Sequence, residues 1–250
     1  MNSRRHHRRP LPAAAMMGWA LLTVLGAGCS TSPGRPAADS ATLAPSEILD
    51  FPTLFADNCS GCHGAEGRGG AAIALSDPVY LAIVDDATIR KTITSGVRGT
   101  AMAAFAQSAG GMLTAKQVEV LTSGIRASWT RPGILASLSP PSYAPRAPGD
   151  VAHGALVFKT YCQSCHGPDG RGGGQASSIT DDSFLALTSD QGLRTVVITG
   201  RPELGAPDWR GNLAGKPMSE QEITDVVAWL VAQRVQTPGQ PYSVANRAQH

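Results

Sequence analysis

Residues 59–70 read CSGCHGAEGRGG, and residues 162–173 read CQSCHGPDGRGG. Both stretches begin with the motif Cys-x-x-Cys-His, and glycines follow it at matching places. Such self-similarity between distant parts of a chain indicates an internal duplication. A chain of 250 residues is long enough for two small domains. The sequence therefore predicts two versions of one structural unit.

The spacing within the motif indicates what each unit can hold. Two thiols one helical turn apart can each add across one vinyl group of the same porphyrin, and the adjoining histidine is then directed at the iron from one side. Cys-x-x-Cys-His is the attachment signature of c-type haem. The sequence therefore predicts two covalently attached haem c groups. The predicted attachment residues are Cys59, Cys62, Cys162 and Cys165, and the predicted proximal ligands are His63 and His166.

Other roles for paired cysteines fit less well. A zinc site could take four thiolates from the two pairs, but it would leave both histidines unexplained and would join the pairs across a proline-rich segment. A thioredoxin-like redox pair would need a βαβ pattern, which is not visible in the sequence. Structural disulfides suit an exported chain, but duplicated Cys-x-x-Cys pairs with a histidine after each rarely serve that role.

Apolar spacing outside the motifs predicts helices. Residues 86–94 and 190–198 carry apolar side chains at helical spacing, and each stretch precedes a glycine, Gly96 or Gly200, that suits a helix C-terminus. Further on in each unit, a capping box opens an amphipathic stretch, which predicts a final helix. No stretch alternates with period two for long enough to predict a sheet. The expected fold class is all-α, in two tandem units.

The predicted domain layout follows this repeat. We expect a signal peptide at 1–28, a lipidated cysteine and flexible tether at 29–46, a first domain at 47–130, a proline-rich linker at 131–150, a second domain at 151–236 and a C-terminal tail at 237–250. The prolines should make the linker semi-rigid and extended. Domains this small need a staple beyond their own core, which a covalent haem would supply.

The N-terminal segment is typical of an export signal. An arginine-rich head at 4–9 precedes an apolar stretch, residues 11–28, that ends in small residues. A retained membrane anchor is less favoured, because the apolar stretch is short for a span and contains proline and glycine. Residues 25–29, LGAGC, resemble a bacterial lipoprotein box, which implies lipidation of Cys29 and a periplasmic protein held at the membrane. An ordinary signal peptide with an incidental cysteine is the alternative.

The charge balance excludes one class of partner. The formal net charge is +2, and removal of residues 1–28 takes away four arginines and leaves 17 basic against 19 acidic residues, or −2. Proteins that bind nucleic acid carry a basic excess on the binding domain. We therefore expect no nucleic-acid partner.

Together these features resemble the class I c-type cytochromes, a family in which helices wrap around one haem. The resemblance covers both units, nearly everything from Leu54 to Arg234. The family's distal motif is a methionine on the loop between the middle and final helices. Residues 99–105, GTAMAAF, are similar to it, which implies that Met102 is the sixth ligand of the first haem. Met112 is the alternative in the same unit.

The second unit departs from the family pattern. When the glycines after the middle helices are aligned, Ala206 stands where Met102 stands. Two interpretations remain open. Met218 reaches the second iron, which is the predicted assignment, or it packs at the start of the final helix and the second iron is five-coordinate or bound by another group. His153 is a further alternative, although a surface histidine is the simpler interpretation.

The resemblance also implies a function. A haem with histidine and methionine ligands has no open iron position, and methionine raises its reduction potential relative to two histidines. We therefore expect an electron carrier without enzymatic activity, exchanging single electrons with an oxidase, a dehydrogenase or another cytochrome, with a larger respiratory complex as a compatible context. The alternative is a haem enzyme or a gas or peroxide sensor that uses an open sixth position at the second haem.

Overall fold

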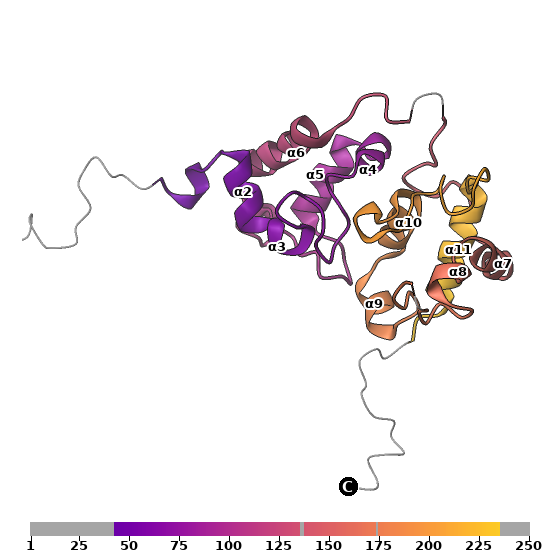
Figure 1. Ribbon diagram of the computed structural model, residues 1–250. Helices are drawn as coiled ribbons and strands as arrows, with labels where there is room; N and C mark the ends of the chain where they lie inside the picture. The colour runs from indigo at the N-terminus through magenta and orange to yellow at the C-terminus, as the bar shows by residue number, and fades with distance from the viewer. Residues whose placement is uncertain (1–42, 136–137, 174, 236–250) are drawn as a thin grey trace, which may run out of the picture. The chain divides into compact units, whose positions relative to one another are not determined.

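The computed structural model describes residues 43–135, 138–173 and 175–235 (Figure 1). These residues form helices joined by loops, with two isolated β-bridges and no strand among them. The all-α fold class is confirmed. No helix within the described ranges is long and apolar enough to cross a membrane. The predicted signal peptide, Cys29 and the predicted tail at 237–250 lie outside the described residues.

The helices repeat in one order in the two halves of the chain. The first half, residues 45–130, contains η2 (Pro45–Glu47), α2 (Phe51–Asn58), α3 (Ser60–His63), α4 (Pro78–Ile83), α5 (Asp86–Ser95), η3 (Gln107–Ala109) and α6 (Ala115–Trp129). The second half, residues 151–235, contains α7 (Val151–Tyr161), α8 (Gln163–His166), α9 (Asp182–Leu187), α10 (Asp190–Thr199), η4 (Pro202–Leu204) and α11 (Glu220–Ala232). From α2 and α7 onward, each α-helix of the first half has a counterpart in the second, as a duplication predicts, whereas η3 lies after Met102 and η4 lies before Ala206.

The final helices begin at the expected capping boxes. The Thr114 hydroxyl accepts a hydrogen bond from the N–H of Gln117, and the Gln117 side chain accepts one from the N–H of Thr114. Ser219 and Glu222 make the same reciprocal pair at the start of α11. Each box satisfies two backbone N–H groups that a helix end would otherwise leave unpaired. These local contacts explain why α6 and α11 start at these residues.

Loss of a cap should be measurable in each half separately. We expect Thr114→Ala and Ser219→Ala each to lower the free energy of unfolding by about 1 kcal/mol, because an N–H in the first turn loses its acceptor. Chemical denaturation of the haem-loaded chain, followed by circular dichroism, measures this. Ser123→Ala, at an exposed mid-helix hydroxyl, is the control and should stay within about 0.5 kcal/mol. Equal losses at all three positions would contradict the capping explanation.

The first and last helices of each half pack against each other, α2 on α6 and α7 on α11 (Figure 1). In the first half, Phe51 covers Gly124, where an added Cβ would lie 2.1 Å from the Phe51 ring. In the second half, Gly154 faces α11, where an added Cβ would lie 2.0 Å from the carbonyl oxygen of Asp225 and 2.9 Å from the Cβ of Trp229. Both crossings therefore depend on one residue without a side chain.

These positions correspond in the duplication. Phe51 and Gly154 both lie eight residues before the first motif cysteine, while Gly124 and Trp229 both lie ten residues after the helix cap. The first half places the large residue on its first helix and the glycine on its last, and the second half does the reverse. Each crossing thus pairs one large side chain with one glycine, but the helix that supplies the glycine differs between the two halves.

A buried arginine ties the linker to the second half. Arg194 of α10 is 2% exposed, and its guanidinium donates to the carbonyl oxygens of Ser142 at 3.0 Å and Tyr143 at 3.1 Å. It also donates to the Thr224 hydroxyl at 2.9 Å and forms an ion pair with Glu220, both on α11. Linker, α10 and α11 thus share one polar cluster.

Candidate functional site

The two Cys-x-x-Cys-His motifs fold alike. In each, the first cysteine separates the preceding helix from a one-turn helix, α3 or α8, and its backbone angles agree closely: φ −120° and ψ −35° at Cys59, φ −120° and ψ −31° at Cys162. Residues three apart on a helical turn lie on one side of it, so the two thiols of each motif share a side. All four motif cysteines are free thiols. They fit the requirement of two thioether bonds per porphyrin.

The first cysteine of each motif is half-buried. Burial, with a smaller contribution from the second cysteine of the motif, raises the pKa of Cys59 to about 11 and that of Cys162 to about 11. Both thiols are therefore protonated at neutral pH. A protonated thiol carries the sulfur and the hydrogen that addition across a vinyl group requires, so attachment leaves the net charge unchanged.

Each motif histidine is held through one ring nitrogen. Nδ1 of His63 lies 2.8 Å from the carbonyl oxygen of Ile73, and Nδ1 of His166 lies 2.9 Å from that of Ser177. A carbonyl oxygen only accepts, so Nδ1 carries the proton and the neutral ring keeps Nε2 as a free ligand atom. Burial lowers the pKa of His63, which favours this neutral form. Ligating histidines are commonly oriented by such a bond, so both rings fit haem iron.

A glycine after each motif makes this geometry possible. Gly64 has φ 83° and Gly167 has φ 79°, the left-handed region that glycine adopts without strain. A Cβ would lie 1.8 Å from the carbonyl oxygen of Arg68 at the first site and 2.4 Å from that of Gly172 at the second. The chain can therefore fold back until a backbone carbonyl reaches the histidine. Sequence reasoning missed these acceptors because backbone carbonyls carry no side-chain signature.

Met102 lies on the loop between α5 and α6. Gly96 ends α5 with φ 65°, and the N–H of Val97 donates to the carbonyl oxygen of Met102 at 2.8 Å. A Cβ on Gly96 would lie 2.5 Å from that same oxygen, so the loop packs tightly on the helix end. Met102 is half-buried, whereas Met112, the alternative, is 82% exposed. The fold holds the backbone of Met102 in place.

Ala206 occupies the same place in the second half. Gly200 ends α10 with φ 67°, and the N–H of Arg201 donates to the carbonyl oxygen of Ala206 at 2.9 Å. A Cβ on Gly200 would lie 2.6 Å from that oxygen. The two loops therefore share this one hydrogen bond, which agrees with the sequence alignment of Ala206 with Met102. They differ in the return bond, because the N–H of Ala206 donates to Arg201, whereas that of Met102 donates to the Thr100 hydroxyl.

Met218 lies directly before the cap of α11. It is 3% exposed, and its N–H donates to the carbonyl oxygen of Trp209 at 2.9 Å. Leu113 has the same place before α6: it is 5% exposed, and its N–H donates to the carbonyl oxygen of Phe105 at 2.8 Å. The assignment of Met218 to the second iron stays a prediction from the sequence, and its backbone position is that of a buried leucine in the other half.

Comparison with known proteins places the chain in a family. The family described as "Cytochrome C oxidase, cbb3-type, subunit III" matches residues 47–121 and 149–230. Each matched segment contains one Cys-x-x-Cys-His motif. The family match therefore repeats in tandem, as the motifs do.

Individual relatives agree with this match. The chain is 34% identical over 131 residues to "Cbb3-type cytochrome c oxidase subunit CcoP" of Azospirillum sp. (strain B510), covering 48% of this chain and 39% of that protein. It is 30% identical over 171 residues to "Cbb3-type cytochrome c oxidase subunit FixP" of Bradyrhizobium sp. (strain ORS 278), covering 64% and 54%. This chain thus spans about half the length of these oxidase subunits, or less.

A further relative aligns along nearly the whole chain. It is the "Cytochrome bc1 complex cytochrome c subunit" of Corynebacterium diphtheriae, 26% identical over 262 aligned positions, covering 96% of this chain and 85% of that protein. Free thiols, oriented histidines and matched segments agree that the chain carries two covalently attached haem c groups. The chain belongs to the cytochrome c oxidase, cbb3-type, subunit III family of c-type cytochromes.

Proposed function

We propose that this chain is a dihaem c-type cytochrome that carries single electrons between redox protein partners. The observation that carries the proposal is the repeated site: two free thiols on one helical turn, followed by a histidine whose Nδ1 is bonded to a backbone carbonyl. When bound, haem c supplies an iron centre that gains and loses one electron. The residues of this chain attach the haem, ligate its iron and orient the ligands.

These residues have distinct roles. The cysteines Cys59, Cys62, Cys162 and Cys165 attach the two haems, and His63 and His166 are the proximal ligands. The carbonyls that accept from each Nδ1–H hold the rings and increase the basicity of Nε2. Met102 would be the sixth ligand of the first haem, so that His63 and Met102 would together leave no open position on that iron. A saturated iron leaves electron transfer as its chemistry.

Location and partners are part of the proposal. Two domains, at 47–130 and 151–236, follow a signal peptide and a tether that begins at Cys29, which carries the lipid. The protein then acts at the periplasmic face of a bacterial membrane beside an oxidase, a dehydrogenase or another cytochrome. This is supported by the arginine-rich head of the chain and by relatives named as subunits of a cbb3-type oxidase and a bc1 complex.

Lipidation has a direct test. We expect the mature protein from its native host to begin at Cys29 and to exceed the mass of the unmodified chain by that of its acyl groups. Mass spectrometry of the N-terminal peptide measures this. Cys29→Ser should remove the added mass and release the protein from the membrane fraction, and an unmodified Cys29 in the native protein would rule lipidation out.

Covalent attachment tests the proposed function itself. The full chain, produced in a host that attaches haem c, should contain two haems, and Cys162→Ser with Cys165→Ser should reduce this to one, because the thioethers of one porphyrin are lost. The pyridine haemochrome assay measures the ratio of haem to protein. Ser164→Ala, an exposed neighbour inside the motif, is the matched control and should keep two haems.

Electron carriage needs a second readout. A potentiometric titration of the haem-loaded chain should show two one-electron steps. A chain that releases its pigment into acidified organic solvent, or that exchanges no electrons reversibly, would contradict the proposal.

A further inference from the structure

We infer that the second haem, held by Cys162, Cys165 and His166, has no methionine ligand and binds small π-acceptor molecules such as carbon monoxide on the side of Ala206. The inference rests on the proposed attachment of haem and goes beyond electron carriage. It assigns the two haems different chemistry: the first is closed by Met102, and the second is open to an added ligand.

The loop of Ala206 shares features of its backbone with the loop of Met102. The N–H to carbonyl pairing of Val97 with Met102 recurs between Arg201 and Ala206, at 2.8 Å and 2.9 Å. The glycine that precedes each loop has nearly the same φ, 65° and 67°. The backbone that carries a thioether in the first half therefore carries a methyl group in the second. A methyl group cannot coordinate iron.

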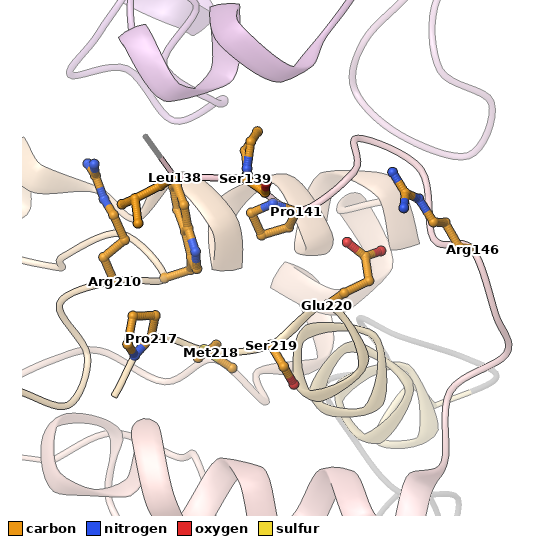
Figure 2. Close-up of a pocket in the computed structure, with 11 residues that line it drawn as sticks. Leu138, Ser139, Pro141, Arg146, Arg210, Pro217, Met218, Ser219 and Glu220 are labelled. Atoms are coloured by element: carbon orange, nitrogen blue, oxygen red, sulfur yellow. The ribbon is translucent and has the colours of Figure 1, made fainter. Parts of the chain in front are cut away.

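Met218 packs as a core residue of the second half. Its side chain belongs to a buried cluster with Phe158, Trp209 and Ile223, as Leu113 belongs to the core of the first half. Met218 also lines a pocket with linker residues, among them Leu138 (Figure 2). The cluster gives the side chain a packing role between α7, α11 and the loop of Trp209.

Moving Met218 to an iron would also disturb the start of α11. Its N–H is bonded to the carbonyl oxygen of Trp209, and the next residue, Ser219, is the helix cap. The sulfur lies 3.8 Å from Nδ2 of Asn212, a weak polar contact within the same loop. A backbone shift here would give up this bond and strain the cap, so the backbone of Met218 is held in the place that Leu113 has in the first half.

Other potential ligands near this loop have partners already. In the described loop 201–218, each carboxylate and the one lysine amine interact with another side chain. The histidine at the start of α7 does so too. The pairs are Glu203 with Arg201, Asp208 with Arg210, Lys216 over the ring of Tyr161, and His153 with Asp225. A haem iron with one protein ligand can take an external one.

Carbon monoxide added to the reduced, full-length protein with both haems attached is the test. We expect one carbon monoxide per chain, measured by optical titration of the Soret band. Met218→Leu should leave this stoichiometry and the sulfur-to-iron absorption band of the oxidised protein unchanged. Ala206→Met should abolish binding, and Met102→Ala should raise it to two per chain. Met112→Leu, at an exposed methionine, is the matched control and should change nothing.

Each other outcome has a definite meaning. If the unaltered protein binds no carbon monoxide and Met218→Leu gains one site, the inference is wrong and Met218 is the ligand. If the unaltered protein binds no carbon monoxide and only Met102→Ala gains a site, another protein group closes the second iron and the inference is also wrong. If the unaltered protein binds two carbon monoxide molecules per chain, both haems are open and the inferred difference between them is wrong. A chain without two haems in the pyridine haemochrome assay would overturn the proposed function instead.

Discussion

Gly124→Trp should destabilise the chain by about 3 kcal/mol, and Phe51→Gly added to it should cause no further loss. The expectation follows from the crossing of α2 and α6, where an added Cβ on Gly124 would lie 2.1 Å from the Phe51 ring. An indole at this position cannot be accommodated while the phenyl ring remains. Removing the ring provides the space, because the second half shows the same crossing with a tryptophan on its last helix.

The double-mutant cycle isolates this coupling. Phe51→Gly alone should cost about 2 kcal/mol, since a half-buried ring leaves a gap. The double variant should be more stable than the sum of the single losses by about 2 kcal/mol. Chemical denaturation of the haem-loaded chain, followed by circular dichroism, measures each value.

A mismatched pair provides the control. Trp229→Gly removes a large residue from the α7–α11 crossing, which does not contact Gly124. Combined with Gly124→Trp, it should therefore lower the free energy of unfolding further. The ring of Trp229 stacks on Phe158 at 4.3 Å between centroids, so its removal has a cost of its own. Simple additivity of Phe51→Gly and Gly124→Trp would show that these two positions are not coupled.

Arg194→Met should lower the free energy of unfolding by about 3 kcal/mol. This is the lower end of the range of losses expected when one partner of a buried ion pair is removed. The lower end applies because the Glu220 side chain is 33% exposed and water partly compensates it. The substitution leaves the carbonyl oxygen of Ser142 and the hydroxyl of Thr224 without the donor that Arg194 supplies, whereas the carbonyl oxygen of Tyr143 keeps a bond from Gln191. Buried acceptors without partners account for much of the loss.

An exposed arginine is the control for this loss. Arg90 pairs with Glu119 on the surface, with side chains 44% and 49% exposed, so Arg90→Met should cost less than about 1 kcal/mol. Equal losses in chemical denaturation at Arg90 and Arg194 would show that burial of the guanidinium has no special role.

The same cluster predicts a pH dependence. Burial acts to raise the pKa of Glu220, but hydrogen bonds from Ser142 and the ion pair with Arg194 outweigh it and lower the pKa. A folded-state pKa below the unfolded one contributes stability that is complete above the unfolded pKa and is lost as the pH falls through the folded pKa. In Arg194→Met this acid-side loss should be smaller, as denaturation midpoints between neutral and acidic pH would measure.

Much of the site could be predicted from sequence because it is local. The motif of Cys59, Cys62 and His63 is one helical turn, and the capping box at Thr114 spans four residues. Helix starts, helix ends and thiol spacing depend on neighbours within one or two turns, which the sequence shows directly.

The tertiary structure alone decided the remaining features. The carbonyl of Ile73 that orients His63 has no side-chain signature, so only the folded loop reveals it. The exchange of Phe51 and Gly124 joins positions far apart in the chain and becomes visible only at the helix crossing. The sequence placed Met218 before the final helix but left the surroundings of its side chain open, and the fold buries that side chain with Phe158 and Trp209. Local patterns determine which elements form, whereas contacts between distant residues determine what each side chain faces.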